Sequence, residues 1–307
     1  MGCLLAWLNG NNRRTHSHRG AGLFGLNAMA RLTSVTIRRF KRIEDLTLQL
    51  DDVTLLIGAN NSGKSSILQA IHFAVSIAQT ARFVGEGVSW GKDKFELSYN
   101  PSPALFSSLR RALIGDRRHA QEPRQSQIEI EFRDETGATC IDGLRRRRNR
   151  NIAVSLVGPH LREQLMAVDK PFTVYAPGLA GVPKEERYMS PGVVRRIVAR
   201  GDANLTLRKV LRMLKSNEPA WKDFIDDMQS IFAGIEIAME FDEDTDENIN
   251  VYFQFPGGTR LPVDAAGTSV LQASQILATS LFSRPRCSFW TSRTHICTRT
   301  TSAYFVT

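Results

Sequence analysis

Apolar and polar residues alternate near the start of the patterned part of the chain, as half-buried strands require. Residues 32–40 read LTSVTIRRF and residues 46–50 read LTLQL, and both runs have a period of two. Residues 53–57 are apolar almost without interruption up to Gly58, which predicts a strand buried on both faces. Further strands are predicted over residues 128–132, 139–144, 152–157 and 172–175.

Helical spacing of apolar residues begins just after residue 57. Residues 64–81 place apolar side chains three and four positions apart, which predicts one helix. The same spacing returns over residues 191–233 and predicts a helical region. Two apolar runs, residues 235–241 and 249–255, then predict a hairpin around an acidic turn.

The turn between the predicted buried strand and the first helix carries the strongest chemical signal. It reads GANNSGKSS and fits the pattern G-x-x-x-x-G-K-[ST]. Glycines permit a tight turn in which backbone N–H groups approach phosphate oxygens, and the helix N-terminus adds a positive dipole end. The sequence therefore predicts a phosphate-binding loop that comprises Gly58, Asn60, Asn61, Ser62, Gly63, Lys64, Ser65 and Ser66.

Two side chains of this loop have distinct expected roles. Lys64 would reach the β- and γ-phosphates of ATP, and the Ser65 hydroxyl would ligate Mg²⁺. The alternative interpretation is a Gly-rich turn with a surface lysine. The strand before the turn and the helix that starts inside it favour the phosphate-binding interpretation.

The net charge says less than its total suggests. The 307 residues hold 40 Lys and Arg against 31 Asp and Glu, and the resulting +9 at first favours an anionic partner such as nucleic acid. Residues 1–28 contribute three arginines without an acid, and residues 283–307 contribute four. Residues 29–282 therefore carry only +2. Bulk charge does not argue for nucleic acid.

The two ends differ from the middle in pattern as well as in charge. Residues 1–28 show neither an amphipathic period nor a strand pattern, and we expect a disordered leader or a mis-assigned start before Met29. There is no run of 18 apolar residues, so no transmembrane helix is expected. The four cysteines are scattered, which favours a reducing cytoplasm over a disulfide framework.

The residues around the loop resemble the start of the SMC/RecF/OLD group of ABC-type ATPases. Residues 35–43 read VTIRRFKRI, and a short strand then leads into GANNSGKSSIL. In that group an I-x-x-F-K strand leads through a hairpin into a G-x-N-x-S-G-K-S loop. The resemblance implies an α/β fold, a P-loop NTPase of the ABC-ATPase-like head type with a mixed β-sheet and an inserted helical lobe. It also implies ATP and Mg²⁺ as cofactors.

The resemblance further implies a signature segment after the helical lobe. Residues 264–272 read DAAGTSVLQ, and Gly267, Thr268 and Ser269 stand where the group has its signature helix. In the group, the N-terminus of that helix contacts the γ-phosphate held by the other protomer of an ATP-sandwiched dimer. The resemblance therefore implies ATP as a ligand and an ATP-sandwiched homodimer in intact relatives. The alternative is an ordinary helix capped by Thr268 or Ser269.

The second acidic half of such an ATPase site is missing from the sequence. Such a site needs an apolar strand that ends in Asp and Glu. The Asp holds Mg²⁺, and the Glu activates the attacking water. Residues 283–307 contain no acid. Read from the third base of each codon, residues 286–291 give four apolar residues and then Asp, if Ser288 has a TCN codon. We therefore hypothesise a frameshift from about residue 282, with no catalytic residue in frame, little hydrolysis and a sheet that lacks a central strand.

These features divide the chain into five expected segments. They are a leader at residues 1–28, an ATP-binding lobe at 29–178, a helical and hairpin lobe at 179–262, a signature-like helix at 263–282 and an out-of-frame tail at 283–307. The fold is thus expected to be incomplete at its C-terminal side.

Several functions remain open besides an ATPase head linked to DNA repair or phage defence. A transporter ATP-binding subunit would show an LSGGQ-type signature, and a small-molecule P-loop kinase would not need so long an insertion after the loop. A non-catalytic ATP sensor is a further alternative. DNA contact rests on the resemblance and on the arginines at 145–148 and 150, which alternatively form the charged edge of a hairpin.

Overall fold

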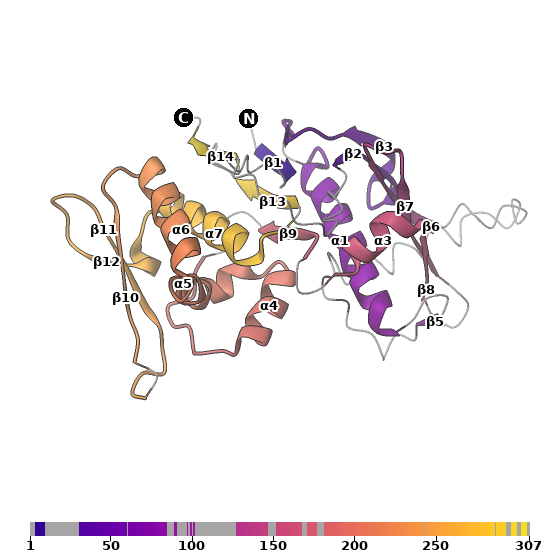
Figure 1. The fold of residues 1–307 in the computed structure, drawn as a ribbon. Helices are drawn as coiled ribbons and strands as arrows, with labels where there is room; N and C mark the ends of the chain where they lie inside the picture. The colour runs from indigo at the N-terminus through magenta and orange to yellow at the C-terminus, as the bar shows by residue number, and fades with distance from the viewer. Residues whose placement is uncertain are drawn as a thin grey trace, which may run out of the picture.

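The chain folds into two lobes, each with its own buried core, and a small sheet lies between them (Figure 1). This computed structural model describes residues 4–9, 31–59, 61–84, 89–90, 97, 99, 101, 127–146, 152–167, 171–176, 181–242, 244–285, 287–292, 296–299 and 302–305. The first lobe is an antiparallel sheet covered by two helices, and the second is mainly helical. The fold is therefore α/β, as the sequence predicted.

The sheet of the first lobe is built from the alternating strands. Val35 and Ile37 are buried, whereas Arg38, on the opposite face, forms ion pairs with Glu129 and Asp45 of the neighbouring strands. Each predicted strand of this lobe is confirmed within a few residues at its ends. The six strands are antiparallel, in the order β3 (Ile43–Gln49), β2 (Leu32–Phe40), β6 (Gln127–Asp134), β7 (Thr139–Arg146), β8 (Ile152–Val157) and β5 (Ser89–Trp90).

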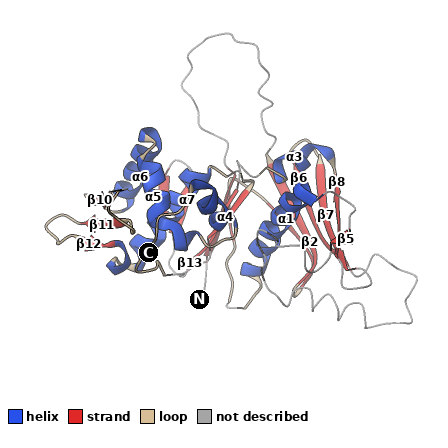
Figure 2. Ribbon diagram, turned by 90° about the horizontal axis from the view of Figure 1, so that it is seen from below, coloured by secondary structure: helices blue, strands red, loops and turns tan. Residues whose placement is uncertain are grey.

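Helix α1 (Lys64–Val84) crosses one face of this sheet beside the short helix α3 (Pro159–Leu165), as Figure 2 shows. From residue 70 to residue 81 every side chain of α1 is buried. This part of α1 therefore has no solvated face, as is typical of a helix in the core of a protein. The Phe73 ring lies 5.9 Å from the ring of Phe40 on β2, which fixes α1 against the sheet.

The sheet between the lobes contains one strand from each end of the chain. Its order is β4 (Val53–Leu55), β1 (Leu4–Asn9), β13 (Cys287–Ser292) and β9 (Thr173–Ala176). Strand β1 lies in the expected leader, and β13 lies in the expected tail, where no packed element was predicted. β1 is antiparallel to both neighbours and β13 is parallel to β9, so backbone hydrogen bonding places both segments without an amphipathic pattern.

The predicted burial of the strand before the loop is wrong. β4 covers three residues at the edge of its sheet, and only β1 pairs with it. Leu55 is 42% exposed and Ile57 is 75% exposed, although both belong to an apolar run. The run predicted a strand buried on both faces, whereas the described residues give β4 one strand neighbour and leave Leu55 exposed.

The second lobe confirms the predicted helices and hairpin. Its helices are α4 (Pro191–Ala199), α5 (Leu207–Lys215), α6 (Glu218–Ile231) and α7 (Thr268–Ser283), with short 3-10 turns η3 (Ala203–Thr206) and η4 (Val263–Ala265). Its sheet has the order β10 (Glu236–Glu240), β11 (Asn250–Gln254) and β12 (Leu261–Pro262). Strands β14 (Ile296–Arg299) and β15 (Ser302–Phe305) pair separately. No helix among the described residues has the length and apolar character needed to cross a bilayer.

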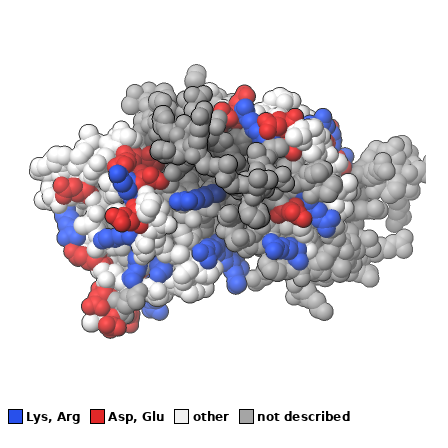
Figure 3. All heavy atoms as spheres, in the orientation of Figure 1, with Lys and Arg blue, Asp and Glu red and all other residues white. Residues whose placement is uncertain are grey.

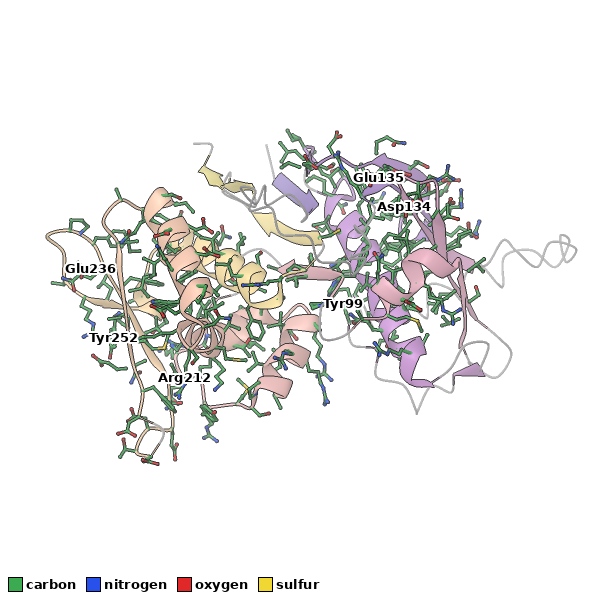
Figure 4. All side chains as sticks on the ribbon, in the orientation of Figure 1. Tyr99, Asp134, Glu135, Arg212, Glu236 and Tyr252 are labelled. Carbon is green, nitrogen blue, oxygen red and sulfur yellow. The ribbon has the colours of Figure 1, made fainter. Side chains whose placement is uncertain are left out.

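His72 of α1 lies where the two lobes meet. Its Nδ1 is 2.9 Å from Oγ1 of Thr173 on β9, and its Nε2 is 3.0 Å from the carbonyl oxygen of Ala199 at the end of α4. The ring of Tyr99, which Figure 4 labels between the lobes, packs edge-on at 4.7 Å. His72 therefore connects α1 both to β9 and to the end of α4.

Acidification is expected to destabilise the fold through His72. Complete burial lowers the pKa of His72 to about 4, although the bond to Ala199 raises it. The folded state therefore prefers neutral imidazole, and stability is lost as the pH falls from about 6.5 toward 4, by roughly 3 kcal/mol if the shift is fully expressed. Urea unfolding at pH 7 and pH 4.5 measures this loss, and a His72→Phe variant should lose less on acidification. Equal losses in both chains would contradict the assignment.

Candidate phosphate-binding site

The Gly-rich turn links β4 to α1 through backbone angles that few residues adopt. Asn61 has φ 63° and Gly63 has φ 95°. Asparagine tolerates the left-handed region better than most residues, and glycine has no Cβ to resist it. The amide of Ser62 donates to the Ala59 carbonyl at 3.3 Å, which closes the turn just before α1 begins at Lys64. Asn60, which belongs to the predicted set, lies outside the described residues.

The ammonium group of Lys64 lies inside the loop. Its Nζ donates to the carbonyl oxygens of Gly58 at 2.9 Å and Ala59 at 2.6 Å, and to Oγ of Ser62 at 3.1 Å. The residue is 8% exposed, which contradicts a surface lysine on a Gly-rich turn. A buried ammonium needs hydrogen-bonded partners, and here the loop itself provides three. The lysine is therefore held at the helix start, at the place where the motif requires a cation.

The two glycines of the loop are needed for different reasons. A Cβ at Gly58 would lie 3.0 Å from Oγ of Ser62, so the hydroxyl would have to shift by a few tenths of an ångström. A Cβ at Gly63 would meet nothing within 4 Å, yet the backbone angle there strongly favours glycine. The space in front of Gly63 is therefore open, and the N-terminus of α1 faces the turn. These features fit a phosphate group.

The hydroxyl groups at the start of α1 are accessible. Ser65 is exposed, as the motif requires of a residue that ligates a metal ion bound to phosphate. Ser66 is half-buried. Within the described ranges, no three His, Cys, Asp or Glu side chains are grouped so as to hold a metal ion. A Mg²⁺ ion at this loop would depend on Ser65, water and the nucleotide.

The signature-like segment begins α7 in the other lobe. Gly267 is the N-cap residue, with φ −59° and ψ 147°, and it forms no side-chain cap hydrogen bond. The alternative in which Thr268 or Ser269 caps the helix is therefore wrong. Val270 packs in the core of the second lobe, whereas α1 packs in the core of the first. Within the described part of one chain, the loop and this segment belong to separate lobes.

Sequence reasoning missed a cluster of buried charges behind that segment. The Glu186 carboxylate accepts hydrogen bonds from the backbone amides of Arg208 at 2.9 Å and Lys209 at 2.6 Å, at the N-terminus of α5. Burial raises the pKa of Glu186 to about 7, against the lowering effect of these two hydrogen bonds. Arg208 in turn bonds Asp264. Glu186 and Arg208 are 22 positions apart in the sequence, and Arg208 and Asp264 are 56 apart, so no local sequence pattern predicts these contacts.

The basic stretch proposed for DNA contact is only partly described. Arg145 and Arg146 end β7 and pair with Ala153 and Ile152 of β8, in a strand that lies between β6 and β8. Residues 147–151 lie outside the described residues. Figure 3 shows acidic side chains gathered at the tip of the β10–β11 hairpin and basic ones elsewhere on the same face. In that view, charge of one sign does not cover the described surface.

Comparisons with known proteins were made with this geometry in hand. Residues 31–256, well over half of the chain, match the family described as AAA ATPase domain. No curated protein gave a match. One similar solved structure is an Smc head bound to the C-terminal winged-helix domain of ScpA, with 12% identity, a TM-score of 0.39, and coverage of 82% of this chain and 77% of that chain. Another is the Pyrococcus furiosus Smc head with an extended coiled coil, bound to the C-terminal domain of ScpA, with 10% identity, a TM-score of 0.37, and coverage of 82% and 79%.

Proposed function

This chain belongs to the AAA ATPase domain family, and we propose that it is an ATP-binding head that holds Mg·ATP in the loop of residues 58–66. The observation that carries the proposal is the position of the Lys64 ammonium, which three oxygen atoms of the loop hold at the start of α1. When ATP binds, phosphate oxygens become the partners of this ammonium. Such charge-assisted hydrogen bonds are about twice as strong as neutral ones.

The other residues of the loop have complementary roles in this proposal. Backbone amides from Asn61 to Ser66 would bind the phosphates, in a turn that the positive φ angles of Asn61 and Gly63 make tight. The Ser65 hydroxyl ligates Mg²⁺, the ion that neutralises charge on the β- and γ-phosphates. Ser62 releases Lys64 as phosphate binds, because both compete for the same ammonium.

We further propose that hydrolysis is impaired in this chain. The Asp and Glu that would hold Mg²⁺ and activate water belong on the strand after α7, which is β13 (Cys287–Ser292). That strand reads CSFWTS and contains no acid. The reading shifted by one base places Asp between positions 290 and 291, which lies on β13. The coincidence of this Asp with a strand parallel to β9 supports the frameshift hypothesis.

Nucleotide binding and turnover test the two parts of this proposal separately. We expect the chain to bind Mg·ATP measurably by calorimetry, and to hydrolyse it at least about 100-fold more slowly than a version whose gene carries the one-base correction. The corrected version is the matched control, because it differs only in the segment after residue 282. Absence of binding would remove the function itself. Equal turnover in the two versions would remove the frameshift, as would a gene sequence that permits no such reading.

The assembly and pathway follow from the same family assignment. We propose an ATP-sandwiched homodimer in which Gly267, Thr268 and Ser269 of one protomer contact the γ-phosphate held by its partner. The exposed, uncapped start of α7 supports this, since free helix amides favour an anion. DNA repair or phage defence in the cytoplasm is the setting we favour, on the resemblance of residues 35–43 and 58–68 and on the buried Cys140, which forms no disulfide. Sedimentation with and without Mg·ATP tests the dimer.

A further inference from the structure

Arg208 joins two segments of the second lobe that are far apart in the sequence. Its side chain is 4% exposed. Nη1 donates to the Pro183 carbonyl at 2.6 Å, and Nη2 donates to the Lys184 carbonyl at 3.2 Å. Nη2 also donates to Oδ1 of Asp264 at 3.0 Å. One side chain at the start of α5 therefore holds both the 181–188 segment and the turn that leads into α7.

Val270 and Ala273 anchor α7 in the core of the second lobe, but the first residues of the helix have no side-chain cap. Gly267 offers no side chain for capping, and Gly267 and Thr268 are exposed. Val263 is buried in the core of the second lobe, and its carbonyl accepts from the Ala266 amide at 3.3 Å. An apolar contact sets how deep the turn lies, but it is not directional. The ion pair of Asp264 with a planar guanidinium is directional, because that group donates in a fixed fork.

We propose that Arg208 and Asp264 are positioning residues that orient Gly267, Thr268 and Ser269 for contact with a γ-phosphate. The inference rests on the proposed function, which assigns that contact to the start of α7. The Arg208 guanidinium is itself held in place, since it also donates to the carbonyl oxygens of Pro183 and Lys184. Lysine at position 208 would keep the charge but would not bond two carbonyls and a carboxylate in one plane.

Glu186 provides a matched control for this proposal. Its carboxylate accepts hydrogen bonds from the backbone at the start of α5. No hydrogen bond described for its side chain goes to the turn before α7. A Glu186→Gln variant therefore disturbs α5 while it leaves the ion pair of Arg208 and Asp264 in place. A purely structural role predicts the same outcome for all three positions. A positioning role predicts a difference.

Amide hydrogen exchange on the nucleotide-free chain tests the local effect. We expect exchange in the peptide of residues 263–272 to rise at least about 10-fold in Arg208→Met and in Asp264→Asn, with no change in the loop of residues 58–66. Glu186→Gln should leave residues 263–272 within about twofold of the parent chain, and Asp264→Glu should restore protection. The proposal is overturned if residues 263–272 exchange at the parent rate in both variants, or if Glu186→Gln raises their exchange equally.

Labelled ATP and sedimentation test the functional effect. We expect Asp264→Asn to bind labelled Mg·ATP within about twofold of the parent chain, and to self-associate with ATP at least about 10-fold more weakly. Asp264→Glu should restore self-association. Unchanged self-association in Asp264→Asn would overturn the proposal. A parent chain that does not bind ATP would instead defeat the proposed function, and the exchange experiment would still decide the positioning role.

Discussion

Replacing Lys64 with methionine is expected to lower the affinity for Mg·ATP by at least about 100-fold. The substitution keeps an unbranched stem of similar length and removes the ammonium that three loop oxygens hold at the helix start. Hydrogen bonds to charged groups contribute roughly 1.5–3 kcal/mol each, and about 1.4 kcal/mol corresponds to a factor of ten. Loss of two such bonds to phosphate therefore exceeds a factor of 100. Calorimetry or fluorescence of a labelled nucleotide measures the affinity.

Lys222→Met is the control for this experiment. Lys222 is exposed on α6, in the lobe that does not contain the loop, so its replacement removes the same charge without touching the site. We expect its nucleotide affinity to equal that of the parent chain. Melting curves of both variants show whether Lys64→Met also loosens the loop. If Lys64→Met binds Mg·ATP as tightly as Lys222→Met does, the loop is not the nucleotide site.

Replacing Asp142 with valine is expected to stabilise the fold by about 1–3 kcal/mol at pH 7, the usual cost of an unsatisfied buried polar group. Asp142 is buried in the middle of β7, and neither carboxylate oxygen has a partner among the described atoms. Its cross-strand neighbours are Ile130 and Leu156, both buried. Valine suits a strand and leaves no polar atom unsatisfied there. Urea unfolding measures the gain.

The pH dependence of that gain identifies its cause. Burial raises the pKa of Asp142 well above its usual 3.8. The folded state therefore prefers the protonated acid, so the parent chain loses stability as the pH rises from about 4 toward the folded pKa, and the valine variant does not. Asp134 is the control, because it is buried on β6 but accepts hydrogen bonds from Thr136 and Ala138. Asp134→Val should destabilise. A loss of stability in both variants would refute the account of Asp142.

Elements that depend on local pattern were predictable from the sequence. The alternation in β2 (Leu32–Phe40) and the helical spacing of α1 were read within a few residues, because side chains near in sequence decide them. The order of the strands was not, because it depends on partners far along the chain. β1 and β13 carry no amphipathic signal, and β4 lies at an edge that its apolar run did not indicate. Pairing partners, rather than propensity, placed these three strands.

The candidate site divides in the same way. The loop from Gly58 to Ser66 was found because glycine spacing and a lysine are local signatures of a phosphate cradle. The contacts of Arg208 with Pro183, Lys184 and Asp264 were not found, since they bring together segments up to 56 positions apart. An arginine at the start of a helix looks like a surface residue until the loop that buries it is known.

The position of β4 at the edge of its sheet affects how strongly this protein is expected to aggregate in solution. Among the described residues, no strand pairs with the outer edge of β4, beside the exposed side chains of Leu55 and Ile57, and exposed strand edges recruit strands from other molecules. Aggregation through this edge would increase with protein concentration and would bury the neighbouring loop. A concentrated sample would then hold fewer accessible nucleotide sites than its absorbance implies. Dilute, freshly filtered samples are therefore the ones in which titrations count true sites.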